Sequence, residues 1–274
     1  MDTLAAAIIM GIVQGLTEFL PVSSSGHLIV VPYLLGITDP FITSLEFSVI
    51  LHVGTLGALL LYFRSDWVRL VPAFLDLIRH RSLARDPDRR LAALLAIATV
   101  PALVIGFLLN DIAELIRNVG LVAVMLVVGG AILWIAERAG SRRRVALDLS
   151  FGQALAIGGA QAIALVPGIS RSGISISAGL FAGLQRDEAA RFSFLMATPI
   201  TAAAAAYELL KVVRGEGIAF QAGPMAAGLV ASFVFGVLAI NVLLRLLRTR
   251  STDMFVVYRV ILAAVVLVTW LNLR

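Results

Sequence analysis

The sequence lacks cysteine and is poor in charged residues. None of its 274 residues is cysteine, and only 14% are Asp, Glu, Lys or Arg. The absence of thiols excludes disulfide bonds, thiolate metal sites and a cysteine nucleophile. The scarcity of charge, together with 60% hydrophobic residues and a mean hydropathy of +0.98, excludes a water-soluble globule. We therefore expect an all-α polytopic membrane protein, in which each spanning helix needs about 20 apolar residues.

The chain also lacks the positively charged start of a signal peptide. It begins Met1-Asp2-Thr3, so the first apolar run is expected to stay in the mature protein. The net charge of +5 could suggest a nucleic-acid partner. However, the arginines lie in short tracts between apolar runs, which is typical of membrane orientation signals. We expect one membrane domain over residues 1–274, in contact with membrane lipids and with no nucleic-acid partner.

Six apolar runs have the length and composition of membrane spans. The run near 200 is rich in alanine and contains Pro199, and the other five are almost uninterrupted. The six runs cover approximately residues 43–64, 91–109, 120–137, 190–210, 223–245 and 254–273.

Two further apolar regions are interrupted by proline. Residues 4–35 contain Pro21, and residues 151–184 contain Pro167. Proline inside a helix removes a hydrogen bond and clashes with the preceding turn, so each region should form two short helices around a break. Because neither arm reaches spanning length, we expect two re-entrant hairpins, which a membrane tolerates only where protein or water surrounds the broken backbone.

The arginine distribution favours the hairpin interpretation. If both hairpins enter and leave on one side, four loops share a side and hold sixteen of the 22 Lys and Arg residues. The positive-inside rule then places these loops in the cytoplasm and both termini outside. The four loops are 64–90, 138–150, 184–191 and 245–253. The opposite side keeps Arg117, Lys211, Arg214 and Arg274.

The two hairpins are related by a repeat with an offset of about 147 residues. The matching pairs are Gly11 with Gly158, Gln14 with Gln161, Ser23 with Ser170, Ser25 with Ser172, and Gly26 with Gly173. Ser24 stands opposite Arg171, so the copies differ at positions able to do chemistry. Each half contains one hairpin and three spans. Because three crossings is an odd number, the second half has the opposite orientation in the membrane, an arrangement typical of transporters. We expect two inverted-topology repeats, over about 1–140 and about 148–274.

The first hairpin carries polar residues within QGLTEFLPVSSSGH, residues 14–27. A carboxylate in hydrocarbon costs about 2.5–3.5 kcal/mol, so Glu18 is interpreted as a metal ligand or proton acceptor, with Gln14 on the same helical face. The alternative is an acid that snorkels at the membrane rim. The following PVSSSGH predicts a helix N-terminus able to bind an anion, and His27 can transfer protons near neutral pH. The alternative is a well-capped structural helix.

The second hairpin carries PGISRSGIS, residues 167–175. Arg171 is the only charged residue between Asp148 and Arg186. Its planar guanidinium suits phosphate oxygens. The alternative is an ion pair with Glu18 that only holds the two hairpins together.

Four other polar residues receive lesser roles. Glu46 and Ser48 are interpreted as bordering the site, and His52 as a hydrogen-bonded packing residue. Arg259 is expected to snorkel to the cytoplasmic face. Gly129-Gly130 indicates close helix packing.

Together these motifs resemble the undecaprenyl-diphosphate phosphatase family of bacterial membranes, also called the bacitracin-resistance protein. The resemblance extends from residue 5 to 273, with both motifs in the expected order. It implies hydrolysis of undecaprenyl (C55 polyprenyl) diphosphate to the monophosphate and phosphate, which recycles the lipid carrier for cell-wall synthesis and confers bacitracin resistance. It also implies a divalent cation (Mg or Ca), a homodimer, and a location in the bacterial inner (plasma) membrane with the site facing the periplasmic side.

The resemblance carries roles onto specific positions. It implies four catalytic residues, Glu18, Ser24, His27 and Arg171. It implies substrate binding by Gln14, Ser23, Ser25, Gly26, Ser170, Ser172, Gly173 and Ser175. The metal would bind Glu18, with Gln14 as a neutral ligand where the family often has Glu. The arginine motif commonly ends in Thr, where this chain has Ser175.

The residues leave the nucleophile and the function class open. Ser24 could attack with His27 as acid–base partner, or water could attack with Glu18 or His27 as base. A transporter or flippase of an anionic lipid or small anion would use the same paired hairpins. The Glu–Ser–His–Arg set is richer than binding requires, which favours an enzyme.

Overall fold

The structure is a computed structural model that describes residues 1–83, 86–109, 118–213 and 221–272. Within these ranges the chain is helical and forms no strand, apart from an isolated bridge between Arg144 and Leu184. This confirms the all-α prediction. Of the four basic residues expected on the less basic side, Arg117, Arg214 and Arg274 lie outside the described residues.

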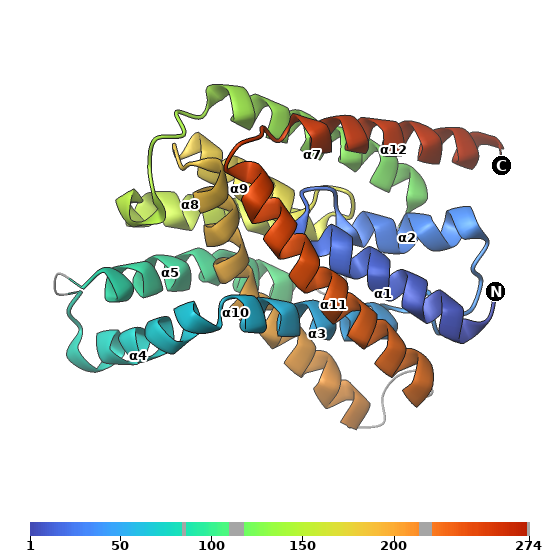
Figure 1. Cartoon of the computed structure of the whole chain (residues 1–274), viewed down its shortest axis with the longest axis horizontal. Helices are drawn as coiled ribbons and strands as arrows, with labels where there is room; N and C mark the ends of the chain where they lie inside the picture. The colour runs from blue at the N-terminus through green and yellow to red at the C-terminus, as the bar shows by residue number, and fades with distance from the viewer. Residues whose placement is uncertain (84–85, 110–117, 214–220, 273–274) are drawn as a thin grey trace.

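Six of the described helices are long and apolar enough to cross a membrane, and they coincide with the six predicted runs. The protein is therefore a multi-pass membrane protein. The N- and C-termini lie towards the same end of the long axis (Figure 1). The six helices are α3 (Leu45–Tyr62), α5 (Pro87–Leu108), α7 (Val119–Ala139), α10 (Arg186–Val213), α11 (Ala222–Leu247) and α12 (Asp253–Asn272).

Both proline-containing regions form two short helices around a break, as predicted. The first consists of α1 (Thr3–Phe19) and α2 (Ser24–Leu35). The second consists of α8 (Phe151–Ala162), which continues as a short 3-10 helix (Ile163–Leu165), and α9 (Arg171–Phe181). None of these helices reaches the roughly 20 residues of a span. Their re-entrant path through a bilayer stays a prediction.

The first helix of each hairpin packs along a spanning helix from the other half of the chain. α1 packs along α11, and α8 packs along α5. Both contacts are close because a glycine lies at each: a Cβ at Gly11 would overlap the carbonyl oxygen of Gly228, and a Cβ at Gly158 would overlap that of Ala98. Gly11 and Gly158 are a matched pair of the repeat. The contact pattern agrees with a repeat, whose inversion stays a prediction.

One α-helix among the described residues was not predicted. The segment 64–90 was interpreted as a loop, but its first part forms α4 (Arg64–His80), which packs against α5. Arg69 and Asp88 pair at 2.9 Å and tie the two helices together. Charged residues are interspersed among the apolar residues of α4, so the segment shows no continuous apolar run of the kind used to find the spans.

Candidate active site

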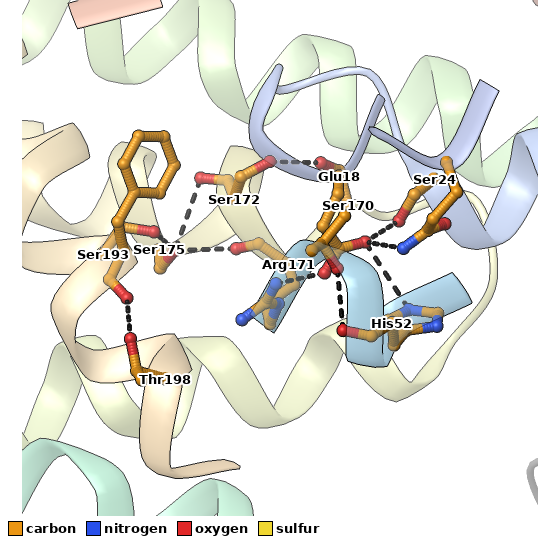
Figure 2. A network of polar contacts seen from close by, with 12 residues as sticks. Glu18, Ser24, His52, Ser170, Arg171, Ser172, Ser175, Ser193 and Thr198 are labelled. Carbon is orange, nitrogen blue, oxygen red and sulfur yellow. Dashed lines mark hydrogen bonds and ion pairs between the residues drawn. The ribbon is translucent and has the colours of Figure 1, made fainter. Parts of the chain in front are cut away.

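The two helix breaks meet at the carboxylate of Glu18, which is 5% exposed. Its Oε2 accepts hydrogen bonds from Gln14 Nε2 at 2.9 Å and from Ser24 Oγ at 2.5 Å. Its Oε1 pairs with a guanidinium nitrogen of Arg171. His52 Nε2 lies 3.5 Å from Oε2. Residues of α1, α2, α3 and α9 thus converge on one carboxylate (Figure 2).

A serine caps the helix that follows each break, and the two caps match. Ser23 has φ 75° and its Oγ accepts from the backbone N–H of Gly26 at 3.3 Å. Ser170 also has φ 75°, and its Oγ accepts from the N–H of Gly173 at 3.1 Å. Ser25 Oγ lies 3.4 Å from Ser23 Oγ. Positive φ is uncommon outside glycine, so the shared conformation marks a specific local geometry. Each cap leaves further helix N–H groups available to an anion.

The remaining predicted serines connect the second hairpin to its neighbours. Ser172 Oγ donates to the carbonyl oxygen of Leu20 at 3.0 Å, which joins one break to the other. Ser175 Oγ donates to the carbonyl oxygen of Arg171 at 2.7 Å and lies 2.6 Å from Ser193 Oγ on α10 (Figure 2). Ser175 is therefore linked to its own helix and to a span.

The ion pair considered as an alternative for Arg171 is present, but it does not use the whole guanidinium. Nη2 contacts Glu18, whereas Nη1 is buried and has no partner among the described residues. Gln14 Oε1 is likewise buried and unpartnered there. Buried polar atoms are normally hydrogen-bonded. These two therefore provide a free donor and a free acceptor on residues that already contact Glu18.

The structure gives the two histidines of this region different surroundings from those expected. His27 is buried, with Nδ1 2.7 Å from the carbonyl oxygen of Ser23 and Nε2 2.7 Å from Tyr258 Oη on α12. His52, interpreted as a packing residue, is the histidine that contacts Glu18. Its Nδ1 lies 2.7 Å from the carbonyl oxygen of Ser48. No motif in the sequence links His52 to Glu18, since the two come together only through helix packing.

Arg259 does not snorkel to a membrane face, so that expectation is wrong. The side chain is 0% exposed, and its Nη2 donates to the carbonyl oxygens of Gly168 at 3.0 Å and Ile169 at 2.5 Å. Gly129 and Gly130 of α7 leave the space that the side chain occupies. The two glycines of α7 thus leave room for the large side chain of Arg259 from α12 to be buried.

The site holds two oxygen donors of the kind that a divalent cation binds. Among the described residues, no group of three or more His, Cys, Asp or Glu side chains could enclose a metal ion. Glu18 supplies one carboxylate, and the unpartnered Gln14 Oε1 is a second hard oxygen. Mg²⁺ commonly binds one or two protein carboxylates and takes its remaining ligands from phosphates and water.

Comparison with known proteins identifies the family of the chain. The model of the family described as bacitracin resistance protein BacA matches residues 7–265. The chain is 47% identical to an undecaprenyl-diphosphatase of Rubrobacter xylanophilus over 270 residues, covering 97% of this chain and 98% of the relative. Its identity to the undecaprenyl-diphosphatase of Gemmatimonas aurantiaca is 45%, covering 97% of this chain and 98% of that relative. With a match over nearly its whole length, the chain belongs to the bacitracin resistance protein BacA family.

Proposed function

We propose that this protein is an integral-membrane phosphatase that hydrolyses undecaprenyl diphosphate to the monophosphate and inorganic phosphate. The observation that carries the proposal is the direct contact of Ser24, Glu18 and Arg171, brought from two helix breaks to one point in a membrane protein. The names of the relatives agree with it. The product is the carrier lipid for cell-wall synthesis, and consumption of its diphosphate accounts for bacitracin resistance.

The diphosphate would be held by positive groups at the two breaks. Unaided hydrolysis of phosphate esters is extremely slow, so the site must neutralise charge and orient a nucleophile. Arg171 can keep one nitrogen on Glu18 and offer the free Nη1 to a phosphate oxygen. The N-termini of α2 and α9 add backbone N–H groups. The polyprenyl chain would lie in the bilayer.

The geometry favours Ser24 over water as the nucleophile. Its Oγ donates to Glu18 at 2.5 Å, so the carboxylate can accept the proton when Oγ attacks the terminal phosphorus. The new bond joins Oγ to phosphorus, and the bond from that phosphorus to the bridging oxygen breaks. Undecaprenyl monophosphate leaves with the proton that Glu18 accepted. Water then hydrolyses the phosphoserine, returns a proton to Oγ and releases inorganic phosphate. The acid–base role given to His27 stays a prediction.

We include in the proposal a divalent cation, a membrane side and an assembly state. Glu18 and Gln14 would hold Mg²⁺ or Ca²⁺, which when bound supplies positive charge to the diphosphate. The protein lies in the bacterial inner membrane, and the family resemblance implies a site that opens on the periplasmic side. The family resemblance implies a homodimer.

Phosphate release from undecaprenyl diphosphate by the purified protein, with and without a chelator, tests the function. We expect release that depends on the cation. A transporter would move the lipid across vesicle membranes without releasing phosphate, and that result would contradict the proposal. Transport alone does not require a serine beside a carboxylate.

A further inference from the structure

Arg259 of α12 is a fully buried cation without an acidic partner among the described residues. Its side chain is the largest fully buried one among the described residues. Its Nε and Nη1 have no hydrogen-bond partner among those residues. Burying a guanidinium that lacks a counter-charge is costly. Within the described part of the chain, its side chain donates hydrogen bonds only to two backbone carbonyls of the second break, those of Gly168 and Ile169.

Those carbonyls belong to the segment that sets the direction of α9. Gly168 has φ +100° and Ser170 has φ 75°, so two of three consecutive residues lie in the left-handed region. A conformation of this kind persists where the surrounding structure holds it. Arg171, which contacts Glu18, follows immediately. A small shift of this segment would therefore move Arg171 relative to Glu18.

The space around the guanidinium is closely defined by α7. A Cβ at Gly129 would lie 2.6 Å from the carbonyl oxygen of Ile169 and 2.7 Å from Arg259 Nη1. A Cβ at the neighbouring Gly130 would lie 3.7 Å from Arg259 Cβ and Cδ, which is ordinary contact. Gly129 thus permits the bond between Arg259 and the break, whereas Gly130 only packs beside the side chain.

The preceding residue of α12 supports the first break in a similar way. Tyr258 Oη lies 2.7 Å from His27 Nε2, and His27 Nδ1 lies 2.7 Å from the carbonyl oxygen of the cap residue Ser23. Two consecutive residues of one spanning helix therefore reach backbone carbonyls at both breaks, one directly and one through a histidine.

We propose that Arg259 is a positioning residue for the reaction: by holding the carbonyls of Gly168 and Ile169, it fixes where Arg171 meets Glu18 and the substrate phosphate. The inference rests on the proposed function for its effect on turnover. Its effect on the break can be measured separately.

The test combines kinetics with an accessibility measurement. The chain has no cysteine, so Ile169→Cys introduces a single thiol at a position that is 2% exposed. Maleimide labelling of this thiol is compared in the parent background and with Arg259→Met, Arg259→Lys, Gly129→Ala or Gly130→Ala added. In parallel, kcat and KM for undecaprenyl diphosphate are measured for the same four variants without the introduced cysteine.

Arg259→Met and Gly129→Ala should both speed labelling and lower kcat by about 100-fold, the scale expected for a misplacement near 1 Å. Gly130→Ala should match the parent in both measurements. Arg259→Lys, which keeps the charge and can still donate to a carbonyl, should recover part of kcat. Gly129→Ala keeps the buried charge, so an effect there separates positioning from charge alone.

Two results would overturn the proposal: parent-like kcat in Arg259→Met, or labelling that none of the four substitutions changes. A parent protein that releases no phosphate would instead refute the proposed function, while labelling would still report on the break.

Discussion

Glu18 accepts hydrogen bonds from side chains of three different helices. Because all three donors bind the same carboxylate, this one group holds the site together. Gln14, Ser24 and Arg171 all donate to it. In a low-dielectric surrounding each donor would be costly to leave unpaired. Replacing any one of these four residues therefore changes the hydrogen bonding of the other three.

The first prediction at the residue scale concerns Arg171. Arg171→Ala should lower phosphate release by orders of magnitude while the protein still inserts and purifies. Arg171→Lys should also be poor, because one ammonium cannot reproduce a planar group that contacts Glu18 and phosphate with separate nitrogens. Arg138→Ala is the control, since Arg138 forms a half-exposed ion pair with Asp253 at 2.9 Å. Near-parent activity in Arg171→Lys would contradict the two-nitrogen role.

Ser24 provides the second residue-scale prediction. If Ser24 is the nucleophile, Ser24→Ala should reduce kcat by at least about 1,000-fold, because the covalent route is lost. Ser25→Ala keeps the contact between Ser24 and Glu18 and should lose far less. Rates of phosphate release from the two variants are compared at saturating substrate. A loss of only about tenfold in Ser24→Ala would instead favour direct attack by water.

The metal requirement is the third prediction at this scale. Glu18→Gln removes the only carboxylate of the motif and should abolish metal-dependent turnover. Gln14→Glu replaces a donor that lies 2.9 Å from Glu18 with a second carboxylate. The two carboxylates then repel each other unless a cation lies between them, so turnover should depend more steeply on Mg²⁺. Turnover is measured against Mg²⁺ and Ca²⁺ concentration. An unchanged metal response in Glu18→Gln would show that Glu18 is not a ligand.

At the scale of elements, the sequence predicted features that lie within one segment, such as the helix breaks, but not the contacts between helices. Pro21 and Pro167 each interrupt an apolar run, and a helix break was predicted at each. Proline alone does not decide this, because Pro101 and Pro199 lie inside spanning helices. The contact between His52 and Glu18 depends on how α3 packs against α1, which neither segment encodes alone. Arg259 was misjudged for the same reason, because its burial depends on glycines in α7.

The close contact between α8 and α5 gives an element-scale prediction. Gly158→Ala places a methyl group against the backbone of Ala98 and should destabilise the fold by about 1–3 kcal/mol. A Cβ at the next residue, Gly159, would have no atom of the described residues within 4 Å, so Gly159→Ala should be neutral or slightly stabilising. Thermal unfolding in detergent compares the two variants. Equal melting temperatures would contradict the close packing.

For the whole molecule, the spans were predictable because apolar length is a property of sequence alone, and all six runs became helices. The relation between the two halves is less direct. The offset pairs such as Gly11 and Gly158 indicated a repeat, and both glycines lie at close contacts with the opposite half. Membrane orientation, in contrast, depends on charge outside the spans.

The last prediction concerns that orientation. The cytoplasmic loops are expected to hold sixteen of the 22 basic residues, so both termini should be extracytoplasmic. The two termini lie towards the same end of the molecule, as this requires (Figure 1). In intact cells, a membrane-impermeant maleimide should label Thr3→Cys and Asn272→Cys but not Ser141→Cys, which lies in an arginine-rich loop. Labelling of Thr3→Cys without labelling of Asn272→Cys would place the C-terminus in the cytoplasm, which would refute the second hairpin as a re-entrant element and the inverted repeat with it.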